Sequence, residues 1–318
     1  MWLRTIFRRR PSAPGGERPT ALNEQLLRRL ERLVLAAPRA LPGGLSGEHP
    51  SRRRMPAPTF SDHRPYSTGD DLRYIDWNAY ARLDHLHMKL GEVEQDVRVT
   101  LLLDCSESMN WGDGDRNKLH FTRLLAAAVG YIALATGDHL QVLSFGGEQT
   151  GSWGPASNRN RATSLLLHLQ RLQAGGTTGA AESITRLGRG LAGPRDAVLR
   201  GGLLVVISDL LHSEELEAAL SSFSPPRWQV LILHVLHPQE LEPPFEGDID
   251  LEDSETGARL PLEADARSLA AYTAAVEHWC DTLADECARR RRMYARLLTD
   301  MPLERAAVPY LRQREILR

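Results

Sequence analysis

A short apolar run that stops at an acidic residue constrains the fold of this chain most. Residues 99–103 are apolar apart from one threonine, and Asp104 follows them directly. A run this short and apolar is typical of a buried strand in a parallel sheet, and residues 203–207, followed by Ser208 and Asp209, repeat the pattern. Because open α/β sheets bind ligands outside the carboxyl ends of their strands, we expect Asp104 and Asp209 to border one site.

The residues after these strands offer oxygen atoms in a pattern that suits a hard cation. Asp104, Ser106 and Ser108 stand at alternate positions, and Thr177 follows two glycines in a loop. Mg²⁺ prefers oxygen ligands in near-octahedral geometry and usually keeps some of its water. Taken alone, Asp-x-Ser-x-Ser also fits a loop that caps the next helix. The three pieces together predict a site for Mg²⁺ or Mn²⁺ made by Asp104, Ser106, Ser108, Thr177 and Asp209.

This order of residues carries a resemblance to a known fold. A strand-end Asp-x-Ser-x-Ser, a loop threonine and a strand-end aspartate form the ligand order of the metal-ion-dependent adhesion site, so the central chain resembles a von Willebrand factor type A domain. The segment upstream resembles the signature of the bacterial domain-of-unknown-function family 58, and it reads Arg64-Pro65-Tyr66-Ser67-Thr68-Gly69-Asp70-Asp71-Leu72-Arg73-Tyr74-Ile75-Asp76-Trp77. The resemblance extends from about residue 52 to the end of the chain.

Strand and helix patterns alternate through the chain, which predicts an α/β fold with a mostly parallel sheet covered on both faces. The resemblance implies a von Willebrand factor A-like three-layer sandwich with an N-terminal extension and C-terminal helix and hairpin additions. Further strands are expected at 139–145, 228–236 and 293–298, and a hairpin at 249–262 with Thr256-Gly257 near its tip. Helices are expected at 118–136, 161–172, 180–191, 214–223 and 267–292, and from Pro302 onward.

Three parts follow one another along the chain. Residues 1–60 read as a basic tail, a short amphipathic helix at 21–37 and a linker; residues 61–97 read as the signature extension packed on the core; residues 98–318 read as the A-like domain with its additions. In the extension we expect Ile75, Trp77 and Tyr80 to be buried anchors.

The signature has two interpretations. It is a docking surface, or it is a polar network that pins the extension to the core. The candidate docking residues are Arg64, Tyr66, Asp70, Asp71, Arg73, Asp76 and Trp77.

Composition excludes several classes of protein. The 318 residues carry a formal net charge of −2, so there is no global electrostatic case for binding nucleic acid. No apolar run approaches the roughly 20 residues that span a bilayer. We therefore expect a cytoplasmic protein. Its basic first ten residues are either a frayed tail or a contact with the inner membrane face. The three cysteines show no metal-binding spacing and are expected to be reduced thiols.

Two functional classes remain open. The chain has no phosphate-binding Gly-x-x-x-x-Gly-Lys-[Ser/Thr] loop and no nucleophile or zinc motif. The resemblance implies that Ser106, Ser108 and Thr177 contact the metal, that Asp104 and Asp209 hold its waters, and that an acidic residue of a client fills the open position.

Relatives of the family accompany MoxR-type AAA+ ATPases, so the resemblance implies a non-enzymatic adaptor that helps such an ATPase to remodel or mature client proteins. The alternative is a hydrolase using the same ion. A hydrolase would need a general base beside the metal, and Glu107 is the only candidate close to the site in the sequence.

Overall fold

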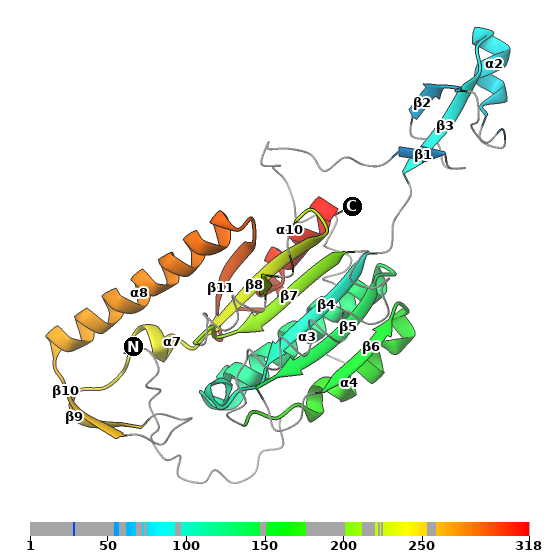
Figure 1. Ribbon diagram of the computed structural model, residues 1–318. Coiled ribbons are helices and arrows are strands. Elements are labelled where there is room, and N and C mark those ends of the chain that lie inside the picture. Colours follow the sequence, from blue (N-terminus) through cyan, green and yellow to red (C-terminus); the bar gives the residue numbers. More distant parts are fainter. Residues whose placement is uncertain are drawn as a thin grey trace. The chain divides into compact units, whose positions relative to one another are not determined.

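The computed structural model describes residues 28, 54–56, 62–67, 72, 75–92, 97–146, 151–175, 201–211, 220, 221, 223, 225–252 and 259–317 (Figure 1). They belong to two compact units. The larger contains Val97–Gln313 and the smaller contains Gly43–Asp96. The two units are described separately.

The larger unit is built on one six-stranded sheet with the order β11-β8-β7-β4-β5-β6. All neighbouring pairs are parallel except β5 and β6, which are antiparallel. The strands are β4 (Arg98–Asp104), β5 (His139–Phe145), β6 (Ser152–Ala156), β7 (Gly202–Ser208), β8 (Trp228–Leu236) and β11 (Met293–Leu298). The five parallel strands are the ones expected from the sequence. The strands that end at Asp104 and before Asp209 lie in one sheet, as predicted, and they are direct neighbours in it.

Strand β6 was not expected from the sequence. It contains Gly154 and Pro155, which are typical of a turn. Proline lacks a backbone N–H, so it is tolerated in a strand at the edge of a sheet. The pairing of β6 with β5 at the end of the sheet is therefore compatible with its sequence.

Helices cover both faces of this sheet. On one face lie α3 (Lys118–Ala135) and α4 (Ala162–Arg171). A Cβ placed on Gly130 of α3 would come within 2.6 Å of Leu165 Cδ2 and 3.1 Å of Leu140 Cδ2, so the helix lies very close to its neighbours there. On the other face, Leu283 and Cys287 of α8 (Ala266–Arg289) join a buried cluster with strand residues. The layers are those of a von Willebrand factor A-like sandwich, which confirms the predicted fold class.

The C-terminal additions also follow the expectation. Strands β9 (Gly247–Glu252) and β10 (Arg259–Ala264) form an antiparallel hairpin. Three short helices complete the described part of the unit: α7 (Pro238–Leu241), α9 (Leu303–Ala306) and α10 (Val308–Leu317). The helix expected at 180–191, the hairpin tip at 256–257 and, except for Arg28, the helix at 21–37 lie outside the described residues. Of the helix expected at 214–223, only residues 220, 221 and 223 are described.

Helix α3 has the length and hydropathy of a membrane span. It is the one helix with this property among the described residues, and 78% of it is buried inside the unit. Its apolar character is therefore explained by its position against the sheet.

The smaller unit is a three-stranded antiparallel sheet with a short helix. Its strand order is β1-β3-β2, from β1 (Arg54–Pro56), β2 (Asp62–Pro65) and β3 (His87–Glu92), and the helix is α2 (Trp77–Leu83). Strand β1 lies in a stretch that was expected to be a linker. It is defined by backbone pairing with β3, and its residues show no alternating apolar pattern that would predict a strand.

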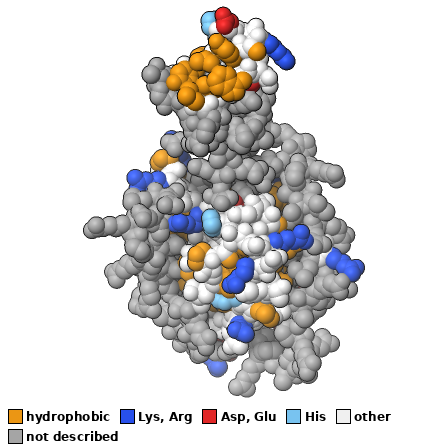
Figure 2. All heavy atoms as spheres, turned by 90° about the vertical axis from the view of Figure 1, so that its right-hand side faces the viewer, with side chains coloured by type: hydrophobic (Ala, Val, Ile, Leu, Met, Phe, Trp, Pro, Cys, Tyr) orange, Lys and Arg blue, Asp and Glu red, His pale blue; other side chains and the backbone are white. Residues whose placement is uncertain are grey.

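The expected anchors of the extension are only partly confirmed. Ile75 is buried and bridges to Met88, as an anchor would. Trp77 and Tyr80 are 61% and 40% exposed, so their prediction as buried anchors was wrong. The physical reason is that α2 is only seven residues long and buries none of them. Figure 2 shows hydrophobic side chains gathered on the surface of this unit.

Candidate metal centre

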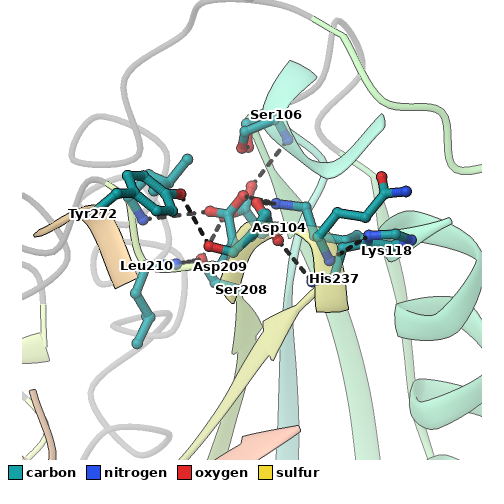
Figure 3. Close-up of polar contacts among 12 residues, drawn as sticks. Asp104, Ser106, Lys118, Ser208, Asp209, Leu210, His237 and Tyr272 are labelled. Carbon is teal, nitrogen blue, oxygen red and sulfur yellow. Dashed lines mark hydrogen bonds and ion pairs between the residues drawn. The ribbon is translucent and has the colours of Figure 1, made fainter. Parts of the chain in front are cut away.

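Two aspartates lie at the carboxyl ends of the central strands β4 and β7. The chain leaves β4 toward β5 on one side and leaves β7 toward β8 on the other, so the strand order reverses between them. Such a reversal point is where open α/β sheets form a binding crevice. Asp104 is 5% exposed and Asp209 is 1% exposed, and Figure 3 shows both side chains in the same polar cluster.

Asp104 is held by neutral hydrogen-bond donors. Its Oδ1 accepts from the Ser106 backbone N–H at 2.9 Å, and its Oδ2 accepts from the Ser208 hydroxyl at 2.5 Å (Figure 3). Burial, followed by the repulsion of the Asp209 charge, raises the pKa of Asp104 to about 6. These two hydrogen bonds orient the carboxylate, and neither donor that the described residues provide here is charged.

Ser106 and Ser108 bring their hydroxyls together next to Asp104. Both side chains are buried, and their Oγ atoms are 2.9 Å apart. Ser106 is the N-cap residue of the 3₁₀ helix η2 (Glu107–Asn110), yet its side chain makes no capping hydrogen bond. The capping interpretation of this hydroxyl was therefore wrong.

The loop of Ser106 depends on a glycine from the next strand. Gly146 follows β5 and has a φ of +82°, and a Cβ at this position would lie 2.7 Å from the Ser106 backbone nitrogen. Only glycine combines this backbone conformation with so close an approach. Gly146 thereby fixes where the Asp104–Ser108 loop can lie.

Asp209, unlike Asp104, has a positive partner among the described residues. The ammonium of Lys118, the first residue of α3, donates to Asp209 Oδ2 at 2.8 Å and to Glu240 Oε1 at 2.7 Å. The Lys118 side chain is fully buried, at 0% exposure. Burial by itself would raise the pKa of Asp209, but the charge and hydrogen bond of Lys118 outweigh it and lower that pKa. For Lys118, the two carboxylates outweigh burial and raise its pKa.

Glu240 ties this ion pair to the C-terminal helices. Its other oxygen, Oε2, accepts from the His237 backbone N–H at 2.7 Å, which closes a capping box at the start of α7. Tyr272 of α8 donates its hydroxyl hydrogen to the Glu240 carbonyl at 2.9 Å. Burial, as the largest influence, raises the pKa of Glu240. The cluster therefore joins β4, β7, α3, α7 and α8 at one point.

The described side chains fit an octahedral cation through their hydroxyls. Neighbouring ligands of Mg²⁺, at about 2.0–2.1 Å from the ion, are about 2.9 Å apart in an octahedron. Ser106 Oγ and Ser108 Oγ are hydrogen-bonded to each other at 2.9 Å, and the same separation suits two neighbouring ligands of such an ion. Within the described part of the chain, no group of three or more His, Cys, Asp or Glu side chains is arranged to hold a metal.

Not all predicted ligands are described. The structure brings Asp104, Ser106 and Asp209 to one edge of the sheet (Figure 3), and Ser108 lies there as the hydrogen-bond partner of Ser106. Thr177 lies outside the described residues. The loop leading toward Thr177 reaches the site, because the Gly175 backbone N–H donates to the Cys105 carbonyl at 3.1 Å.

Cys105 and Glu107 flank the candidate ligands. The Cys105 thiol is buried, and burial, followed by the charge of Asp104, raises its pKa to about 12, which makes it a poor nucleophile at neutral pH. Glu107, the candidate base, accepts from the Asn110 side-chain amide at 3.3 Å.

Sequence reasoning missed Lys118, Ser208 and Glu240. One signal for Lys118 was present: of the 39 lysines and arginines in the chain, only Lys89 and Lys118 are lysines. A second signal was its position at the start of an apolar helix, where the helix dipole disfavours a cation. Because lysine is rare in this chain and a cation is disfavoured at the start of a helix, a lysine at position 118 indicates a specific anionic partner.

The candidate docking residues of the signature are only partly described. Asp76 is buried, and its Oδ1 accepts from the backbone N–H groups of Asn78 and Ala79, so it caps α2. Tyr66 is half-buried and Trp77 is exposed. Only the backbone of Arg64 is described, and Asp70, Asp71 and Arg73 lie outside the described residues.

Comparison with known proteins places the chain among relatives without an assigned activity. A family described as "Protein of unknown function DUF58" matches residues 62–279. The uncharacterized protein Rv1480 of Mycobacterium tuberculosis is 28% identical over 257 residues, which is 78% of this chain and 78% of that protein. The uncharacterized protein Mb1516 of Mycobacterium bovis matches with the same values.

Two solved structures are also similar. The conserved hypothetical protein BatB from Bacteroides thetaiotaomicron is 18% identical, with a TM-score of 0.41, over 70% of this chain and 100% of that chain. A von Willebrand factor type A protein from Catenulispora acidiphila is 13% identical, with a TM-score of 0.38, over 70% of this chain and 43% of that chain.

Proposed function

The chain belongs to the DUF58 family, and we propose that within it this protein is a metal-dependent protein-interaction module. The carboxyl-end face of β4 and β7 is the docking surface, and Mg²⁺ or Mn²⁺ is the ion. Ser106 and Ser108 would hold the ion directly, while Asp104 and Asp209 would hold its waters. The bound ion would supply an attraction for a partner's carboxylate.

The observation that carries this proposal is the convergence of two buried hydroxyls and two buried aspartates at the strand reversal point. One side of both carboxylates is already used inside the protein, by Ser208 on Asp104 and by Lys118 on Asp209. Neutral hydroxyls as direct ligands leave much of the ion's charge uncompensated. An acidic side chain of a partner protein would then form a strong and directional charge-assisted contact with the ion.

The partners we propose are a MoxR-type AAA+ ATPase and a client protein that presents an acidic residue. This class of ATPase is the one that the family resemblance implies. In this arrangement the protein acts as an adaptor for the remodelling or maturation of the client and catalyses no reaction itself. We propose a cytoplasmic location, with peripheral contact at the inner membrane face.

The test is a pull-down of the co-occurring ATPase or a client by the full chain, in Mg²⁺ and in EDTA. We expect binding in Mg²⁺ that is lost in EDTA and in the double variant Ser106→Ala/Ser108→Ala. Changing the partner's acidic residue to alanine should abolish binding as well. Thr282→Ala, which removes an exposed hydroxyl that donates to the His278 carbonyl within α8, is the control and should bind normally.

A second variant locates the interface if the proposal is wrong. Trp77→Ala alters the exposed face of α2 in the smaller unit. Binding that persists in EDTA and in the serine double variant, but is lost in Trp77→Ala, would assign the interface to the signature segment instead.

A further inference from the structure

We propose that Lys118 is a positioning residue that holds Asp209 in place when no metal is bound and that limits how tightly the site takes a divalent ion. The inference rests on the proposed function, because it concerns the regulation of that same site. Nothing in the family resemblance assigns a role to this lysine.

The ammonium of Lys118 is enclosed by protein. Its side chain is 0% exposed, and its two described contacts are with carboxylates, Asp209 at 2.8 Å and Glu240 at 2.7 Å. The Asp209 side chain is 1% exposed, whereas that of Glu240 is 13% exposed. Charges at this depth are weakly screened, so the ammonium acts at full strength on its neighbours.

This positive charge has two consequences for the site. It keeps Asp209 charged and oriented beside the equally buried Asp104, so that the face is assembled before any ion arrives. It also opposes a second cation, since a divalent ion held near Asp209 meets the field of an ammonium that is already there. The site should therefore bind Mg²⁺ weakly by itself.

A weak site of this kind favours binding of ion and partner together. The incoming carboxylate supplies the negative charge that Lys118 cancels on Asp209. Each of the two, ion and partner, then raises the affinity of the protein for the other by the same factor. In this arrangement Lys118 prevents the face from being permanently loaded with metal in the absence of a partner.

Glu240 makes the proposal testable, because it shares the ammonium with Asp209. In Glu240→Gln the single amide oxygen accepts either from the His237 N–H or from the Lys118 ammonium, and in both orientations the negative charge beside Lys118 is removed. Asp209 then faces the undivided positive charge. Lys118→Met/Glu240→Gln removes one positive and one negative charge together, so the net charge is unchanged while Asp209 is freed for the ion.

The experiment is calorimetric titration of Mg²⁺, and of Mn²⁺ as a second probe, into the metal-stripped full chain. We expect weaker binding by Glu240→Gln, by about threefold or more, and tighter binding by the double variant, by about tenfold or more. Glu277→Gln is the control, because its partner Arg296 forms an ion pair of similar length, 2.7 Å, on the surface. It should leave the affinity unchanged.

A lysine with only a structural role would not shift the metal affinity of the two variants in opposite directions. Equal losses in both variants, or no change in Glu240→Gln, would overturn the proposal, and the latter result stands even if the double variant does not fold. Tight binding by the double variant with none by the wild type would support the role of Lys118 and overturn the metal-dependent function. Absence of binding in every variant would overturn both.

Discussion

Asp104 and Asp209 lie at the carboxyl ends of neighbouring parallel strands and are almost equally buried, yet their pKa values are shifted in opposite directions. Asp104 receives hydrogen bonds from a hydroxyl and a backbone N–H, and its pKa is raised to about 6. Asp209 receives a buried ammonium, and its pKa is lowered. The position at the end of a strand therefore does not decide the state of a carboxylate; its counter-charge does.

The two aspartates therefore belong to two sides of the site with different roles. The Asp209 side is a permanent ion cluster that links strands and helices whether or not a ligand is present. Among the described residues, the contacts of Asp104 with Ser106 and Ser208 are neutral. We propose that this side takes the cation, and the two sides should respond differently to substitution.

The largest expected effect comes from removing the ammonium. Lys118→Met leaves Asp209 and Glu240 buried without a positive partner, and we expect a loss of about 3–5 kcal/mol of unfolding free energy. Urea denaturation with metal removed measures it. Glu277→Gln breaks a half-exposed ion pair instead and should cost less than about 1 kcal/mol. Equal costs for the two variants would contradict the special status of the Asp209 side.

Next in size is a change in the backbone beneath the Asp104 side. Gly146→Ala adds a Cβ that would lie 2.7 Å from the Ser106 nitrogen, at a φ of +82°. We expect a loss of about 2–4 kcal/mol, combining the left-handed conformation with overpacking. Gly137→Ala is the matched control: its φ is also +82°, but nothing lies within 4 Å of the new Cβ. A loss no larger than the control's would mean that the loop yields easily.

A stabilising substitution is expected at Asp104. Asp104→Asn keeps an oxygen for the Ser106 N–H and removes the repulsion with Asp209. At pH 7 and without metal, we expect a gain of about 1–3 kcal/mol. The same variant should lose any stabilisation by Mg²⁺. Asp209→Asn should instead destabilise the protein, because it leaves Lys118 with a single carboxylate.

The raised pKa of Asp104 determines how the effect of Asp104→Asn on stability changes with pH. The pKa of Asp104 is about 6 in the folded protein against 3.8 for the ordinary side chain. Between these values the folded state binds more protons than the unfolded state, so the contribution of Asp104 to stability falls as the pH rises from about 4 to 6. The advantage of Asp104→Asn over the wild type should grow across this range in EDTA. An advantage independent of pH would contradict the raised pKa.

The smallest effect is expected at the hydroxyl that supports Asp104. Ser208→Ala removes the donor to Asp104 Oδ2 and the acceptor of the Leu210 N–H. We expect a loss of about 1–2 kcal/mol at neutral pH, where the carboxylate is charged and loses its donor. Because protonation reduces the need for that donor, the loss should be smaller at pH 4 than at pH 7. Denaturation at the two pH values measures the difference.

Sequence patterns predicted the sheet well because burial and periodicity are local signals. The apolar runs at 99–103 and 203–207 identified two strands of one parallel sheet, whose carboxyl ends lie at the same edge; that the two strands are neighbours came from the structure. Strand β6 was missed because its Gly154-Pro155 pair has no strand pattern and because its position depends on pairing with β5.

The remaining features of the site depend on contacts between distant parts of the chain. Lys118 and Glu240 are 122 residues apart and meet only because α3 and α7 begin at the same edge of the sheet. Spacing cannot reveal such a pair. The exposure of Trp77 was missed for a related reason, since an aromatic residue in a short helix is apolar whether or not a neighbour covers it.

The complete burial of Lys118 makes this site accessible to direct chemical observation. An amine that no reagent can reach in the folded state is acylated only when the structure opens, so its labelling rate reports the opening free energy of the cluster. With only one other lysine, Lys89, in the chain, the product is simple to assign by peptide mass. Isotopic labelling of lysine alone would likewise yield two side-chain signals, one of them from an ammonium whose hydrogens exchange slowly with water.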